Sequence, residues 1–365
     1  MTPRVARAVG CGDHSEASRL GIQSLILAAA IGVGVTSVGV AFAGGIVGMF
    51  GGSASVSAYA EPYLRIRSLS SIPVLLVQAG NGYFRGYQDT RTPLYILTAG
   101  AALHVVAEWL LIYPAGLGVD GAAWATVIGQ SVAAAAFVWV QVRRMRGARW
   151  RPDPAVMRSL LVIGGDLAVR TGALLAAMTI ATSVAARMGN VELGAWQVAQ
   201  QVFLFLALLL DSVAIAAQAL VGRYLGAASP ARAAEISRRL MTWGVALGLL
   251  LLVFVGTLAS PLSHLFSGSE RVVVASIPLL LWVAAVQPLS SAAFTLDGIL
   301  IGASDTRFLA GSMVLSSLLY AAVAVLSLRA GWGTAGLAAG ATIWMIARTA
   351  TTGARFWGGR WAFRP

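Results

Sequence analysis

The chain has 365 residues, of which 58% are hydrophobic and 11% are charged, and its mean hydropathy is +0.78. Soluble domains carry roughly 25% charged residues, so this composition excludes a soluble domain and indicates a polytopic, all-α membrane protein. The formal net charge of +12 comes from arginine, since the chain contains no lysine. Because the arginines cluster between apolar runs, we attribute this charge to membrane topology and expect no nucleic-acid partner.

Ten apolar segments follow one another along the chain, most of them long enough for a spanning helix, which needs about 20 residues. Few residues separate them, and backbone groups inside lipid must be paired, so the segments are predicted to be helices. They cover residues 20–49, 57–84, 93–113, 120–142, 156–187, 192–222, 236–265, 272–301, 308–328 and 334–354.

The arginines are unevenly distributed over the segments that join these helices. Alternating the sides places most of them on one side, including Arg146, Arg149, Arg348 and Arg360, and leaves Arg170 inside a helix. The positive-inside rule then places both termini in the cytoplasm.

The sequence repeats itself at an offset of 216 residues. The string NGYFRGYQDTR at 81–91 corresponds to DGILIGASDTR at 297–307. One period holds six predicted helices, an even number, so the halves have the same orientation, as in transporters built from parallel repeats. We therefore expect two six-helix bundles, the first of them incomplete. Residues 1–142 form about four helices, 143–155 a cytoplasmic linker, and 156–365 the six-helix second bundle.

Two repeated features are predicted to be structural. Asp89 and Asp305, in the two DTR strings, each precede a helix and can cap its first N–H groups. Prolines at matched positions predict kinks that both bundles retain, and bending at such kinks is a hypothesis for gating. The matched pairs are Pro62 with Pro278 and Pro73 with Pro288.

The sequence resembles the multidrug and toxic-compound extrusion (MATE) family, and most of all its DinF-type branch. The resemblance is carried by GNGYFRGYQDTRTPL (80–94), LDGILIGASDTR (296–307) and LDSVAIAAQALVGRYLG (210–226). It implies twelve helices in two bundles around a central cavity, and export of amphiphilic, often cationic, compounds in exchange for protons or sodium ions. We accordingly expect a monomer without a cofactor in a bacterial plasma membrane.

By the same resemblance, the chain lacks the first two helices of the family. The first of these carries an acid that is important for cation coupling, so no residue here can be assigned that role. The expected explanation is a start codon assigned too far downstream.

His104 and Glu108 form the first candidate site. Their i, i+4 spacing puts two titratable groups on one face of a predicted membrane helix, where charged residues are costly and therefore candidates for function. The resemblance implies that they belong to a cation-linked network which Thr126 joins from the next helix. His104 departs from the asparagine that is usual in the family. Alternatively, the pair only fixes helix packing.

Asp211 is the second coupling candidate, because it interrupts a long apolar run. Gln218 follows seven residues later on the same face, and the resemblance directs both toward the cavity or the bundle interior. Gln197 and Gln201 are weaker candidates for the cavity lining. Asp211 could instead be a structural acid bonded to neighbouring helices.

Asn81 and Asp297 occupy matched positions of the repeat, one to two turns inside the membrane, and are candidates for the substrate cavity. Asp166 and Arg170 are spaced i, i+4, and we expect a structural ion pair between them.

The leading functional hypothesis is a cation-coupled exporter, with protons favoured over sodium. A lipid-linked precursor flippase of the same superfamily is the alternative, but it would be expected to have a strongly cationic cavity, and the arginine count assigns only Arg170 to the membrane interior. A third possibility is a non-transporting, truncated remnant. The chain has a single cysteine, and we find no metal cluster and no nucleophile–base constellation, so we predict no metal site and no enzyme.

Overall fold

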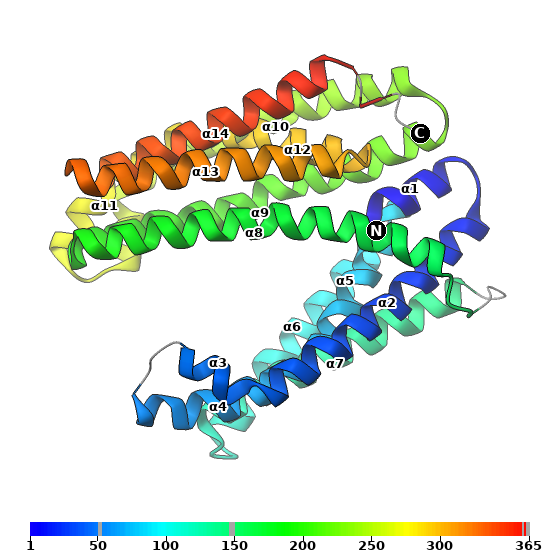
Figure 1. Cartoon of the computed structure of the whole chain (residues 1–365), viewed down its shortest axis with the longest axis horizontal. Coiled ribbons are helices and arrows are strands. Elements are labelled where there is room, and N and C mark those ends of the chain that lie inside the picture. Colours follow the sequence, from blue (N-terminus) through cyan, green and yellow to red (C-terminus); the bar gives the residue numbers. More distant parts are fainter. Residues whose placement is uncertain (50–52, 146–149, 360, 363–365) are drawn as a thin grey trace. The chain divides into compact units, whose positions relative to one another are not determined.

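The computed structural model describes residues 1–49, 53–145, 150–359 and 361–362, and these residues form fourteen α-helices (Figure 1). The chain divides into two compact units, Met1–Leu160 and Leu161–Pro365, which we describe separately.

The first unit holds seven helices and the start of an eighth. They are α1 (Thr2–Gly10), α2 (His14–Ala41), α3 (Ala43–Met49), α4 (Ala54–Ser68), α5 (Ser71–Gly86), α6 (Arg91–Ile112), α7 (Gly118–Arg144) and the beginning of α8 (Pro154–Met188). Val156 and Leu160 of α8 pack in the core of this unit, so the boundary between the units in the sequence falls within α8. The predicted division at 143–155 stays a prediction, and residues 146–149 of that linker lie outside the described residues, as does Arg360.

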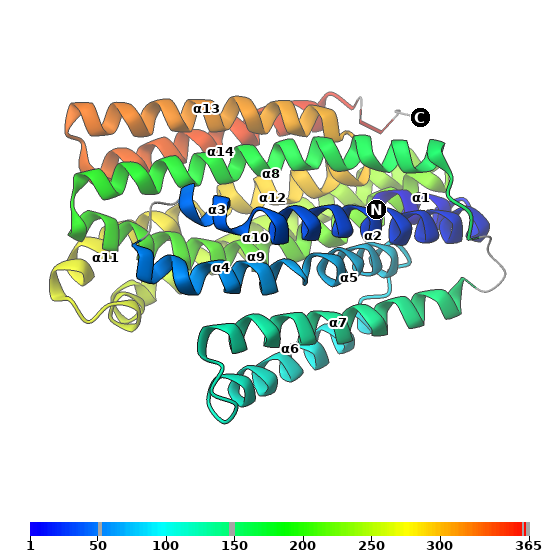
Figure 2. The same cartoon turned by 60° about the horizontal axis from the view of Figure 1, so that its bottom comes forward.

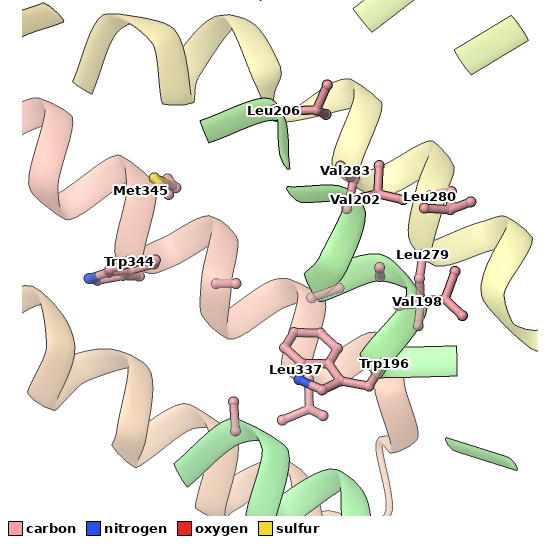
Figure 3. Packing of buried hydrophobic residues seen from close by; sticks show 14 of the residues in the cluster. Trp196, Val198, Val202, Leu206, Leu279, Leu280, Val283, Leu337, Trp344 and Met345 are labelled. Atoms are coloured by element: carbon pink, nitrogen blue, oxygen red, sulfur yellow. The ribbon is translucent and has the colours of Figure 1, made fainter. Parts of the chain in front are cut away.

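The second unit contains the rest of α8 and six more helices. These are α9 (Asn190–Gly226), α10 (Pro230–Phe266), α11 (Glu270–Ala285), α12 (Gln287–Gly302), α13 (Thr306–Ala330) and α14 (Gly333–Trp357). Its core lies where α9, α11 and α14 meet (Figure 3). The residues labelled there are Trp196, Val198, Val202, Leu206, Leu279, Leu280, Val283, Leu337, Trp344 and Met345.

The sequence repeat is present in the helices themselves. α5, at Ser71–Gly86, shifts by 216 residues onto α12 at Gln287–Gly302. Even the unusual backbone positions repeat, because the non-glycine residues Gln88 and Ser304, again 216 apart, both have a left-handed φ, of 62° and 64°. Few non-glycine residues adopt this conformation, so its recurrence supports one architecture for both repeats.

The repeated glycines of the motif lie where helices approach closely. A Cβ built on Gly298 of α12 would lie 2.6 Å from the Cα of Ala214 in α9. In the first unit, a Cβ on Gly82 of α5 would lie 2.9 Å from the Cβ of Met1, beside α1. Since only glycine leaves room at such contacts, the motif serves helix packing at both sites.

Both units have a broken helix pair at matched places. Pro73 is the third residue of α5, which follows the break after α4, and Pro288 is the second residue of α12, which follows the break after α11. α11 and α12 are bent by 49°. Pro62 and Pro278 instead lie inside helices that continue past them. The breaks therefore occur at the second proline pair, where the ring removes a backbone donor.

Seven helices of the described chain are long and apolar enough to cross a membrane, or eight if the bent pair α11–α12 is one span. The chain is therefore a multi-pass membrane protein, with fewer spans by length and composition than the ten predicted. Segment 57–84 falls short because it is divided into α4 and α5, each under 18 residues. Segment 334–354 is not among these candidate spans, although α14 has 25 residues.

Candidate functional site

In the first unit, α6 and α7 run side by side and bring the predicted coupling residues together (Figure 1 and Figure 2). His104 Nε2 of α6 lies 3.2 Å from Thr126 Oγ1 of α7. His104 Nδ1 lies 3.9 Å from Glu108 Oε2, too long for a hydrogen bond but within ion-pair range. The side chains of His104 and Glu108 are 35% and 41% exposed, so both are open to solvent or lipid.

The hydrogen-bond pattern indicates which of these groups donates and which accepts. Thr126 Oγ1 donates its own hydrogen to Ala122 O at 3.1 Å, so it accepts from His104 Nε2–H. In the neutral imidazole the other nitrogen is then an acceptor, and Nδ1 presents its lone pair toward Glu108. The pair can therefore hold one additional proton, on the carboxylate or on Nδ1.

Small residues let α6 and α7 approach at this site. A Cβ on Gly129 of α7 would lie 2.9 Å from the His104 Cβ, and a Cβ on Gly100 of α6 would lie 3.1 Å from the Ala133 Cβ. These contacts hold His104 against α7 through packing as well as through its hydrogen bond.

The second unit contains a buried charge cluster that joins three helices. Arg170 of α8 and Arg348 of α14 both donate to Oδ2 of Asp297 in α12. The Asp297 and Arg348 side chains are 4% and 3% exposed, and that of Arg170 is 17% exposed. The cluster carries one excess positive charge when all three groups are ionised.

Parts of this cluster have no hydrogen-bond partner in the described chain. Asp297 Oδ1 and the Nε atoms of both arginines are buried and unpartnered. The Arg348 guanidinium also lies over aromatic rings, 4.8 Å from the centroid of Phe294 and 5.9 Å from that of Trp344. Burial of unpaired polar atoms is costly, which makes this cluster a candidate site.

Arg348 was missed at the sequence level. Alternation of the connecting segments places it on the basic side of the membrane, but the structure buries it within α14. Its place inside the apolar segment 334–354 was the signal that could have identified it.

The predicted pairing of Asp166 with Arg170 is replaced by other partners. Arg170 pairs with Asp297, while Asp166 Oδ2 accepts from Thr306 Oγ1, at the start of α13, at 2.7 Å. The i, i+4 spacing gave the right helix face, but the stronger partners lie on neighbouring helices.

The remaining predicted cavity residues do not form one cluster. Gln197 and Gln201 line a cavity of about 340 Å³ near the start of α9, whereas Gln218 lies near its end, about 31 Å from Gln197 along the helix. Asp211 lies between them and interacts electrostatically with Arg348.

Asn81 of α5, in the first unit, is buried, and its Oδ1 has no partner in the described chain. It therefore remains a candidate, in the position that the repeat matches to Asp297.

The two aspartates of the DTR strings stabilise the fold through different contacts. Asp89 caps α6, since its Oδ1 accepts from Thr92 N at 3.0 Å, and its Oδ2 accepts from Arg144 at 2.6 Å. Asp305 makes no side-chain cap and instead accepts from Arg355 Nε at 2.7 Å. In each unit the aspartate thus ties its loop to the last helix.

Helices that repeat within one chain, with titratable groups held between spanning segments, define a membrane transporter rather than an enzyme. The sequence profile of the MatE family matches residues 1–110 and 173–326. The protein belongs to the MATE family.

Two relatives show how the chain compares within the family. It is 34% identical over 291 residues to Protein DETOXIFICATION 44, chloroplastic, of Arabidopsis thaliana, a match that covers 79% of this chain and 55% of the relative. It is 24% identical to DNA damage-inducible protein F of Escherichia coli, over 87% of this chain and 70% of the relative. The chain thus spans just over half the length of the plant protein, and the DinF-type branch is supported less strongly than the family.

Solved structures show the same fold. A crystal structure of MATE in the bent conformation has a TM-score of 0.89 at 19% identity, and the match covers 98% of this chain and 81% of that one. A MOP superfamily transporter from Pyrococcus furiosus, described as having reverse polarity of its binding pocket, has a TM-score of 0.88 at 20% identity and the same coverage.

Proposed function

We propose that this protein is a secondary active exporter that exchanges protons for amphiphilic, often cationic, compounds by alternating access. The observation that carries the proposal is the series Glu108, His104 and Thr126, on two membrane helices of a MATE chain, in which His104 is hydrogen-bonded to Thr126 and lies within ion-pair range of Glu108. Intramembrane ionisable residues commonly mark ion pathways in transporters.

The chemistry of these groups favours a proton over a metal cation. Hard cations are bound by several oxygen ligands, whereas this series offers one carboxylate, one hydroxyl and an imidazole nitrogen. Imidazole and carboxylate are the usual carriers of a transferred proton. Protonation of the pair changes its charge, and this change can bias one of two conformations.

Transport in reconstituted vesicles tests the proposal. The full chain in liposomes with an imposed pH gradient is expected to move ethidium, and Glu108→Gln is expected to lose most of the gradient-driven flux. His104→Gln keeps an amide donor near the position of Nε2, which bonds Thr126, and removes the titratable ring, so it should shift the pH profile of transport.

The matched control is Asp120→Asn, which removes an acid from the first turn of α7 in the same unit. This variant should keep wild-type flux. Equal flux in Glu108→Gln and wild type would remove Glu108 from the mechanism and leave Asp211 as the coupling candidate. An inert wild-type chain would instead support a non-transporting remnant.

A second candidate function is supported by one observation, the burial of Arg348 beside Arg170. A flippase for lipid-linked precursors must accommodate a diphosphate, and two buried arginines that share the carboxylate of Asp297 supply the guanidinium groups that bind phosphates. A fluorescent polyprenyl diphosphate in the same vesicles separates the two functions. If the flippase is correct, this lipid changes leaflets and Arg348→Gln stops it, whereas ethidium does not move.

We further propose the bacterial plasma membrane as the location, with both termini in the cytoplasm and the protein acting as a monomer. The excess of arginine on one set of connecting segments supports the orientation.

A further inference from the structure

A groove runs along one face of α10, beside the end of α14. It encloses about 610 Å³. From α14 it is lined by Phe356 and Trp357. From α10 it is lined by side chains that recur at helical spacing and so form one continuous stripe, about 16 Å long. These are Arg238, Met241, Thr242, Val245, Ala246 and Leu249.

The polar end of this groove lies where the membrane boundary is expected. α10 has no charged residue from Leu240 to Ser263, and Arg238 and Arg239 directly precede this run. Basic residues at the end of an apolar run lie at the level of lipid headgroups. Trp357, 74% exposed, is a residue typical of the same interfacial layer.

A second cavity of about 330 Å³ continues the groove beyond Arg238. It shares Arg238, Phe356 and Trp357 with the groove and is also lined by the first residues of α10. Trp361 closes it, since this ring stacks on Phe356 and its Nε1 donates to Phe356 O at 2.8 Å. The apolar groove therefore leads to a smaller cavity, with the Arg238 guanidinium where the two meet.

The charges nearby leave Arg238 available for an anion. Arg239 pairs with Glu235, and Arg355 pairs with Asp305, whereas Arg238 has no ion pair within the described residues. An unpaired guanidinium at the head of an apolar groove matches a phosphate that is linked to an acyl chain.

The geometry points to a binding site for one anionic phospholipid, its phosphate on Arg238 and an acyl chain along the α10 stripe. Thr242, one turn further on the same face, donates its hydroxyl to Arg238 O at 3.2 Å, so Arg238 is the group in this stripe that meets the phosphate. The site belongs to the second unit alone, because the repeat places buried Ile22 at the position that matches Arg238. It is independent of the transported substrate.

Native mass spectrometry of the detergent-solubilised full chain tests this site. Titration with phosphatidylglycerol should give bound states that phosphatidylcholine does not. Arg238→Gln should weaken phosphatidylglycerol binding about fivefold, the effect of one basic residue at a membrane surface. Arg239→Gln changes the formal charge equally but lies outside the groove, and it should leave the affinity within about twofold.

A second pair of variants tests the apolar part without changing charge. Ala246→Trp fills the groove and should abolish phosphatidylglycerol binding, whereas Leu250→Trp, exposed on α10 and outside the groove lining, should not. Equal losses in Arg238→Gln and Arg239→Gln, or equal retention of the two lipids by the wild type, would overturn the proposal. Unchanged binding in Ala246→Trp would also overturn it.

Discussion

Replacing Asp297 by asparagine removes the only carboxylate of the buried cluster and leaves Arg170 and Arg348 facing a neutral amide. Asp297 and Arg348 are almost fully buried, and removal of one partner of a buried ion pair costs about 3–5 kcal/mol. Since Asp297 pairs with two arginines, its replacement should lower the free energy of unfolding by more than the replacement of either arginine.

The three single variants should therefore differ in a fixed order. Arg348→Gln leaves the Arg170 pair intact and should cost about 1.5–3 kcal/mol, the value of a hydrogen bond to a charged group. Arg170→Gln should cost less, because the Arg170 side chain is 17% exposed. Asp297→Asn leaves two arginines without a carboxylate, and adding Arg348→Gln removes one of these unpaired charges. The double variant should therefore lose less stability than the sum of the losses of the two single variants.

Thermal unfolding in detergent, followed by tryptophan fluorescence, measures these effects. One kcal/mol shifts Tm by about 2–4 °C for a unit of this size, so Asp297→Asn should melt about 6–20 °C below wild type. A Tm within about 2 °C of wild type, or strict additivity in the double variant, would refute the view that burial makes these charges interdependent.

Packing, pH and topology give three more predictions. Gly129→Ala should lower the free energy of unfolding by the cost of overpacking, about 1–3 kcal/mol, and thereby lower Tm, because its Cβ would lie 2.9 Å from a side chain of α6. Gly164→Ala places a Cβ with nothing within 4 Å of it and should not lower Tm. Burial raises the pKa of Asp89, but hydrogen bonds, including that from Arg144, lower it by more, so its pKa lies below the usual value. Ionised Asp89 should therefore stabilise the folded protein above about pH 3.9, and this contribution should be lost as the pH falls through the lower pKa of the folded state. A Tm series from pH 6 to pH 3 should show this loss in wild type but not in Asp89→Asn. Cys11, exposed between α1 and α2, should react with an impermeant maleimide only after the cytoplasmic side is opened, and labelling of intact cells would contradict the proposed orientation.

The class of the protein could be predicted from the sequence because the responsible signals are local. Apolar runs report helices, and a fixed offset reports a repeat, whatever the tertiary arrangement. The matched motifs 81–91 and 297–307 therefore indicated the family, and α5 and α12 bear out the offset helix by helix. The i, i+4 spacing singled out His104 and Glu108, the family resemblance added Thr126, and the structure brings the three side chains together.

The partners of the buried charges were decided by tertiary structure alone. Sequence spacing paired Asp166 with Arg170, but each of them has its partner on another helix, Thr306 of α13 and Asp297 of α12. Arg348 looked like a loop residue by the side-counting rule, yet the rotation of α14 turns it into the core against Asp297. The sequence predicts which face of its own helix a side chain occupies, because that depends only on helical periodicity. Which groups lie opposite that face depends on how the helices pack, and those groups determine whether a charge is solvated, paired or available to a ligand.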